Sequence, residues 1–86
     1  MNAPTQQERL AHQCSESLHS RDRAAQMLGI RILECGPGHC ELAMAVTAAM
    51  LNGHGVCHGG LLFALADTAL AHASNSRNKL SVASIC

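Results

Sequence analysis

The spacing of apolar residues along the first third of the chain predicts a helix. Between residues 6 and 28, apolar side chains recur every three to four positions, as they do on one face of a helix. Serines weaken the pattern, and we expect a break near Ser20, while Gly29 is a natural residue to end the helix. The expected buried stripe consists of Leu10, Cys14, Leu18, Ala25 and Leu28.

The next segment carries the pattern of two strands joined by a tight turn. Residues 30–35 are rich in branched side chains and partly alternate, and residues 40–47 alternate more clearly. The segment between them, Cys35-Gly36-Pro37-Gly38-His39, has strong turn chemistry. The pattern therefore predicts an antiparallel hairpin.

Beyond Met50 the sequence pattern changes twice, first to a glycine-rich segment and then to an apolar one. Residues 51–60 contain four glycines and two histidines, and glycine permits unusual backbone angles and close approach by another group. Residues 61–74 then predict a strong helix that is apolar on nearly every face, a pattern typical of a helix wrapped by other structure. A third strand is expected in residues 79–86.

Composition and charge exclude several classes of function. Six basic and six acidic residues balance to zero, and Phe63 is the only aromatic residue, so the chain lacks both a basic patch and a base-stacking surface for nucleic acid. With 48% hydrophobic residues the middle of the chain is not expected to be disordered. The longest apolar stretch, residues 42–51, is too short to span a membrane.

The first ten residues have neither a basic start nor an apolar core, which argues against a secretory signal. The five cysteines form an odd set without CxxC spacing. We therefore expect reduced thiols in a cytoplasmic protein rather than a disulfide framework.

Asp67 is the first candidate for chemistry. It is the only acidic residue after Glu41, it lies in the middle of the apolar helix, and no Lys or Arg occurs between Arg31 and Arg77. A carboxylate in apolar surroundings is costly to ionise and suits a general base or nucleophile. An ordinary solvent-exposed aspartate on a helix face is the alternative.

Gly59 and Gly60 precede this helix, where free backbone N–H groups can stabilise an oxyanion or hold a phosphate. A tight turn into the helix is the simpler explanation. Asp67 lies eight residues beyond Gly59, which is roughly 12 Å along a helix. One small reacting group cannot touch both residues of one helix, whereas two antiparallel copies can each supply one of them. Cooperation between these residues therefore requires at least a dimer.

Three further residues of the glycine-rich segment, His54, Cys57 and His58, suggest zinc ligands, completed by Cys35, His39 or Cys40. Familiar zinc sites show paired ligands, and His54 with His58 is the only such pair within this segment. A loop histidine bonded to the backbone is the simpler reading. Cys57 as a nucleophile with His58 as base is disfavoured, since adjacent side chains seldom face one another.

Taken together, these residues resemble the hotdog-fold acyl-CoA thioesterases, and among them the PaaI-type hydroxyphenylacetyl-CoA thioesterases of phenylacetate degradation. The motifs occur in the expected order: Asn52-Gly53-His54, His58-Gly59-Gly60 and Leu65-Ala66-Asp67-Thr68-Ala69. The resemblance runs from about Ala24 to Ser84. It implies an α+β hotdog fold, in which a curved antiparallel sheet wraps a central helix.

The same resemblance assigns roles to residues. Asp67 is expected to activate water or attack the thioester carbonyl, and the N–H of Gly59 to polarise that carbonyl from the facing subunit. Asn52 is expected near the reacting thioester. His58 and Gly60 are expected to shape the substrate corner, Gly60 by supporting the turn.

The resemblance also implies the reaction and the partners. An acyl-CoA such as (hydroxy)phenylacetyl-CoA is hydrolysed to the acid and CoA, without metal or cofactor, by a homodimer or homotetramer with cross-subunit sites. Residues 1–23 are expected to form an N-terminal helical segment, and 24–86 the N-terminal part of a C-terminally truncated hotdog domain. The alternatives are an inactive hotdog fragment, an acyl-CoA-binding module, or a small metal-binding domain.

Overall fold

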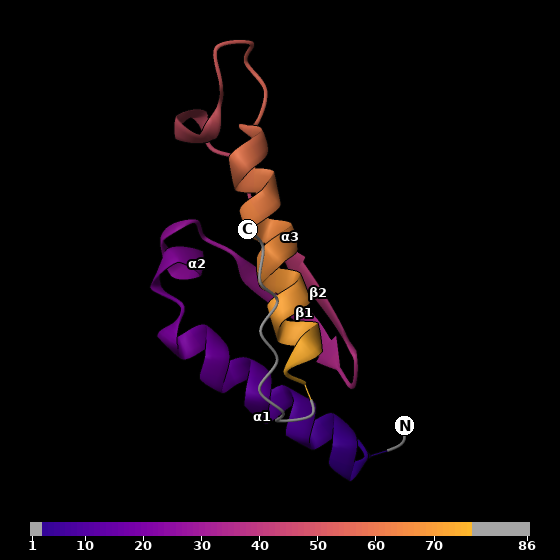
Figure 1. Cartoon of the computed structure of the whole chain (residues 1–86). Helices are drawn as coiled ribbons and strands as arrows, with labels where there is room; N and C mark the ends of the chain where they lie inside the picture. Colours follow the sequence, from indigo (N-terminus) through magenta and orange to yellow (C-terminus); the bar gives the residue numbers. More distant parts are fainter. Residues whose placement is uncertain (1–2, 77–86) are drawn as a thin grey trace.

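The computed structural model describes residues 3–76, and its elements follow the expected order (Figure 1). Three helices, two strands and a short 3-10 turn occur in this part of the chain: α1 Gln6–Arg21, α2 Arg23–Met27, β1 Arg31–Gly36, β2 His39–Ala43, η1 Ala48–Met50 and α3 Gly59–Ser74. Helices and an antiparallel sheet together confirm the α+β class. The third strand expected in 79–86 lies outside the described residues.

Capping side chains decide where the first two helices begin and end. The hydroxyl of Thr5 accepts the N–H of Glu8, whose carboxylate in turn accepts the N–H of Thr5, so α1 begins with a capping box. The helix breaks at Asp22, two residues after Ser20 and thus where a break was expected, because the Asp22 carboxylate accepts the Ala25 N–H at 3.0 Å and starts α2.

The buried face of α1 is offset by one residue from the predicted stripe. Ala11 and Ser15 are fully buried, whereas Leu10 is 37% exposed. Ala25 in α2 is buried as expected. The small side chains of Ala11 and Ser15 allow α1 to approach β1 closely, and this close approach outweighs the larger apolar area of Leu10.

Gly29 ends α2 as predicted. Its φ is +70°, its N–H donates to the Gln26 carbonyl, and the N–H of Ile30 donates to the Ala25 carbonyl at 2.9 Å. These two bonds form a Schellman motif, in which glycine adopts the left-handed backbone at no steric cost. The motif directs Ile30, which is 3% exposed, into the core.

Strands β1 and β2 form the expected antiparallel hairpin. Arg31 pairs with Ala43 and Cys35 with Cys40, with one irregularity in register between Ile32 and Glu34. β2 ends at Ala43 and not at residue 47 as expected. The reason is that Ile30, the next residue outward on β1, uses its N–H in the cap of α2, so the hairpin ladder stops there.

Helix α3 lies along the hairpin, and the described structure covers it on one side only (Figure 1). It packs chiefly against β2, while α1 packs against β1. On the opposite side, Leu62, Phe63 and Leu70 are each about half exposed. The expectation of a helix wrapped all round is thus met on one face within residues 3–76. No helix in this range is long and apolar enough to cross a bilayer.

The two long helices meet through a buried polar contact. The Ser15 hydroxyl of α1 lies 3.0 Å from Nδ1 of His72 in α3. Both residues are at least 95% buried, His72 to 2% exposure and Ser15 to 5%. Burial lowers the pKa of His72 from its usual 6.5; the His19 ring lowers it further and the Asp22 carboxylate opposes these effects. His72 is therefore held neutral at the point where α1, α3 and the sheet converge.

This burial predicts a pH-dependent stability. The folded-state pKa of His72 lies below the unfolded value, so its contribution is fully present above pH 6.5 and is lost as pH falls through the folded pKa. We expect the free energy of unfolding to decrease on acidification below pH 6.5, and this decrease to be smaller in His72→Gln. Denaturant unfolding over a pH series measures both slopes.

His54→Gln is the matched control, because His54 is an exposed loop histidine. It should retain the slope of the parent chain. An unaltered slope in His72→Gln would contradict the assignment.

Candidate functional site

Asn52 organises the glycine-rich loop before α3. Its side-chain Oδ1 accepts the N–H groups of His54 at 2.9 Å and of Val56 at 3.3 Å. Its backbone exchanges further bonds with Val56 and with Gly55, which has a φ of +80°. The loop is closed by a bridge between Leu51 and Cys57. The side-chain Oδ1 of Asn52 thus holds the loop. Its Nδ2 makes no hydrogen bond with a described residue and can donate to a ligand.

His58 caps the helix and thereby separates the roles of the two glycines. Its Nδ1 accepts the Gly60 N–H at 3.2 Å, and its carbonyl accepts the N–H groups of Leu61 and Leu62. The N–H of Gly59 makes no hydrogen bond with any described residue. Gly59 therefore presents the one first-turn donor that is not already used, at the positive end of the α3 dipole.

Gly59 is also sterically open. A Cβ built on it would meet no atom of the described chain within 4 Å, whereas one on Gly60 would touch the His58 ring at 3.5 Å. Contacts within residues 3–76 would thus allow a Cβ at position 59. A group from outside this part of the chain has room to approach its N–H.

Asp67 lies on the uncovered face of α3. At 100° per residue, it shares a face with Phe63 one turn before it and Leu70 one turn after it, and these two side chains are 54% and 49% exposed. His72, in contrast, points to the sheet and is 2% exposed. Asp67 is half-buried and makes no ion pair or hydrogen bond with any residue in 3–76. A single carboxylate therefore sits in an exposed apolar surface.

The predicted site residues form two separate groups. His58, Gly59 and Gly60 lie at the N-terminal end of α3, and Asn52 lies in the loop that leads into it; Figure 1 shows this loop beyond the end of the helix. Asp67 lies two turns further along the same helix, roughly 12 Å away by helix rise. Within one copy of the described chain the carboxylate and the free amide are thus too far apart to hold the same reacting group.

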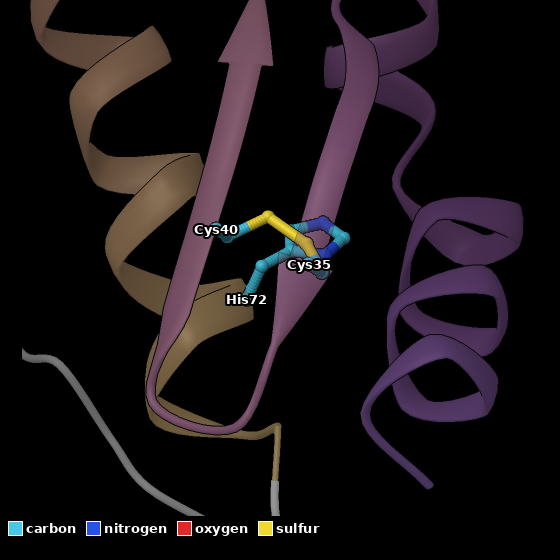
Figure 2. A group of neighbouring side chains, drawn as sticks. All are labelled: Cys35, Cys40 and His72. Atoms are coloured by element: carbon cyan, nitrogen blue, oxygen red, sulfur yellow. A yellow bond between two sulfur atoms is a disulfide. The ribbon is translucent and has the colours of Figure 1, made fainter. Parts of the chain in front are cut away.

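The cysteine prediction is wrong for one pair. Cys35 and Cys40 face each other across the hairpin and are joined in a disulfide, whereas Cys14 and Cys57 are free thiols (Figure 2). The physical reason is the register: residues directly opposite on an antiparallel pair have their side chains on one face, a few ångströms apart. The spacing of two cysteines around a strong turn is the sequence signal for this pair.

The zinc alternative built on the loop does not form as expected. In the described residues, three potential ligands come together elsewhere, namely Cys35, Cys40 and His72, whose ligand atoms lie within 4.8 Å of one another. Neither His54, Cys57 nor His58 belongs to this group. The sequence analysis missed Ser15 and His72, because their proximity depends on how α1 and α3 cross.

Comparison with known proteins identifies relatives of this chain. The chain is 49% identical over 76 residues to the acyl-coenzyme A thioesterase PaaI of Escherichia coli, a match over 88% of the chain and 54% of that protein. The structure of the E. coli PaaI protein from the phenylacetic acid degradation operon superimposes with a TM-score of 0.80 at 47% identity, over 81% of this chain and 51% of that one.

A mutant structure of the phenylacetic acid degradation protein PaaI from Thermus thermophilus matches with a TM-score of 0.65 at 44% identity, over 70% of this chain and 55% of that one. No protein-family model matches the chain. The chain spans about half the length of the curated relatives it matches.

These similarities and the α3–hairpin packing define the class: the chain has the corresponding part of a hotdog fold. More particularly, it is homologous to the PaaI acyl-CoA thioesterases.

The loop geometry generates a prediction for Asn52. Asn52→Ala removes the side-chain acceptor of two hydrogen bonds, each worth about 1 kcal/mol. The backbone N–H groups of His54 and Val56 should therefore exchange roughly fivefold faster with deuterium. Asn52→Asp keeps an oxygen acceptor and should preserve protection. Hydrogen exchange read by NMR at these two amides measures the effect. Equal exchange rates in the two variants would contradict the loop role.

Proposed function

We propose that the chain supplies the catalytic residues of an acyl-CoA thioesterase, which hydrolyses an acyl-CoA to a carboxylic acid and free CoA. The observation that carries the proposal is that one helix holds a carboxylate, Asp67, and an amide, Gly59, neither of which has a hydrogen-bond partner among residues 3–76. Thioester hydrolysis needs both groups: a base or nucleophile at the carbonyl carbon and a donor at the carbonyl oxygen.

In this proposal each group has a definite task. The Gly59 N–H, aided by the α3 dipole, stabilises negative charge on the carbonyl oxygen as the tetrahedral intermediate forms. Asp67 either removes a proton from the attacking water or attacks the carbonyl itself, and the C–S bond then breaks to release CoA thiolate, which takes up a proton. In the second route the acyl group is left on Asp67 as a mixed anhydride, which water hydrolyses to the free acid and the Asp67 carboxylate. Nδ2 of Asn52 donates to the thioester region, and His58 holds the turn that exposes Gly59.

The two groups act together only across a subunit interface. Gly59 and Asp67 each lie four residues from Phe63. If two antiparallel α3 helices cross at Phe63, a two-fold axis there brings Gly59 of each copy opposite Asp67 of the other. The exposed side chains of Leu62, Phe63 and Leu70 support such an interface, because pairing would remove their apolar surface from water. A homodimer, or a homotetramer built from it, is the proposed active unit.

For the acyl group we propose phenylacetyl or hydroxyphenylacetyl, within phenylacetate catabolism. The support is the similarity to proteins named for phenylacetic acid degradation. We also propose a cytoplasmic location. Residues 24–86 are proposed as the hotdog part, with 1–23 as an N-terminal helical segment.

Asp67→Asn tests the proposed chemistry. Loss of the carboxylate should lower kcat for phenylacetyl-CoA by about 10²–10⁴-fold, the usual contribution of a positioned base. KM should change little, because the amide has nearly the same shape. Release of free thiol measures turnover, on the 86-residue chain and on a version extended to the length of a hotdog domain.

Glu41→Gln is the matched control, since Glu41 is an exposed carboxylate on β2, and it should retain full activity. Turnover that survives in Asp67→Asn would contradict the role of Asp67. No turnover of any acyl-CoA by either parent form, with binding retained, would instead identify an acyl-CoA-binding module. Single-turnover hydrolysis in isotopically labelled water separates the two roles of Asp67, because only a nucleophile acquires label.

The proposed interface generates a second prediction. Phe63→Glu should weaken self-association by about 10²–10⁴-fold, since each copy loses about 1.5–3 kcal/mol of apolar burial. Activity should fall in parallel, because each site needs both copies. Sedimentation velocity measures association, and Met27→Glu is the control, since Met27 is 80% exposed on α2. Full activity in a monomeric Phe63→Glu variant would contradict the cross-subunit site.

A further inference from the structure

A second cluster of reactive side chains lies on the opposite side of α3 from Asp67. Cys35 of β1, Cys40 of β2 and His72 of α3 converge beneath α1, and their two sulfurs and one ring nitrogen lie within 4.8 Å of one another (Figure 2). Cys35 is 3% exposed and His72 2% exposed. None of these residues takes part in the proposed thioesterase chemistry.

The Ser15 hydroxyl lies 3.3 Å from Cys35 Sγ and 3.0 Å from Nδ1 of His72. In the tautomer in which the hydroxyl donates to the sulfur, Nδ1 of His72 donates to the Ser15 oxygen. The lone pair of the neutral ring then resides on Nε2. That atom is buried and has no hydrogen-bond partner among the described residues.

A buried nitrogen without a partner is costly and calls for an explanation. Cys35 and Cys40 lie beside this ring, and neutral imidazole and thiolate are the ligands that zinc prefers. Histidine ligands also commonly bond through their second nitrogen to an orienting group, as Nδ1 does here to Ser15. The cluster thus has ligand types, spacing and an orienting contact suited to a metal ion.

We propose that, once the Cys35–Cys40 disulfide is reduced, Cys35, Cys40 and His72 bind a zinc-class divalent cation, with Ser15 as the positioning residue. The disulfide and the metal are alternative occupants of one site. In tetrahedral zinc two thiolate sulfurs lie about 3.7 Å apart, a separation that opening the disulfide permits. Three protein ligands leave the fourth position to solvent.

A groove gives solvent and ions access to the cluster. A cavity of about 470 Å³ lies between α1 and β1, and both Ser15 and Cys35 line it. Three carboxylates also line it, from Glu8, Glu16 and Glu34. Their negative charge favours the approach of a cation over that of an anion.

The exchange of occupants balances in two steps. A dithiol reductant transfers two electrons and two protons to the Cys35–Cys40 bond; its own sulfurs become a disulfide while the chain gains two thiols. The cation then displaces both thiol protons into solvent and binds two thiolates and the neutral His72 ring. The bound ion links β1, β2 and α3, so it acts on stability and does not depend on the proposed thioesterase activity.

Cobalt(II) is the probe for this site, because thiolate ligation produces a charge-transfer band and tetrahedral geometry intense visible bands. The test uses the full chain with Cys14, Cys57 and Cys86 changed to Ser, reduced with a phosphine. We expect one cobalt per chain, displaced by zinc, and none in the oxidised chain. Cys40→Ser and His72→Gln should lose the bands. Ser15→Ala should keep them but bind about 10–100-fold more weakly.

His54→Gln is the matched histidine control and should bind like the parent, with circular dichroism confirming the fold of every variant. Ser15→Ala and Cys40→Ser keep the test decisive if His72→Gln fails to fold. Absence of stoichiometric binding by the reduced chain would overturn the proposal. So would cobalt bands that persist in Cys40→Ser or in a folded His72→Gln.

Discussion

The one-sided packing of α3 is the constraint on which the rest of the structure depends. Its inner face rests on the hairpin and on α1, and every buried contact of the helix lies there, including His72. Its outer face carries a carboxylate among half-exposed apolar side chains. Exposed apolar faces of this kind commonly mark interaction surfaces, in agreement with the proposed dimer. The proposed chemistry and the proposed assembly therefore arise from the same surface.

The inner face shows the opposite character. Its core is small in volume, built from Ala11, Ala25, Ile30, Cys35 and Met50, and a polar group of Ser15 and His72 occupies its centre. Polar groups in a core stabilise a single arrangement only when their bonds are satisfied. In the disulfide form one nitrogen is left without a partner. In the two proposals, the outer face of α3 carries the thioesterase chemistry and the inner face the disulfide or metal site.

Local sequence signals predicted most of the elements and the residues of the candidate site. Gly29, the hairpin turn and the apolar run of α3 each depend on residues close in sequence, so the sequence pattern predicts them. Asp67 was also legible, as an isolated charge in an apolar helix. The break near Ser20 was also predicted, and a capping bond sets its exact position at Asp22.

The remaining features depend on tertiary crossing. Ser15 and His72 are 57 residues apart, and no periodicity in either helix signals that they meet. The Cys35–Cys40 pair is an intermediate case between local and tertiary features. The spacing of the two cysteines around a turn is a signal that they lie close together. The expectation of reduced thiols rested instead on the redox state of the cytoplasm, which says nothing about the distance between two cysteines.

The open space around Gly59 has a consequence for how this chain tolerates change. Since no described atom lies within 4 Å of a Cβ at that position, a side chain there would leave the fold intact, and replacing glycine in a helix tends to stabilise it. Selection on stability alone would thus favour losing this glycine. An alanine variant at position 59 would therefore fold normally and would not be degraded, and its defect would show only in the reaction with substrate.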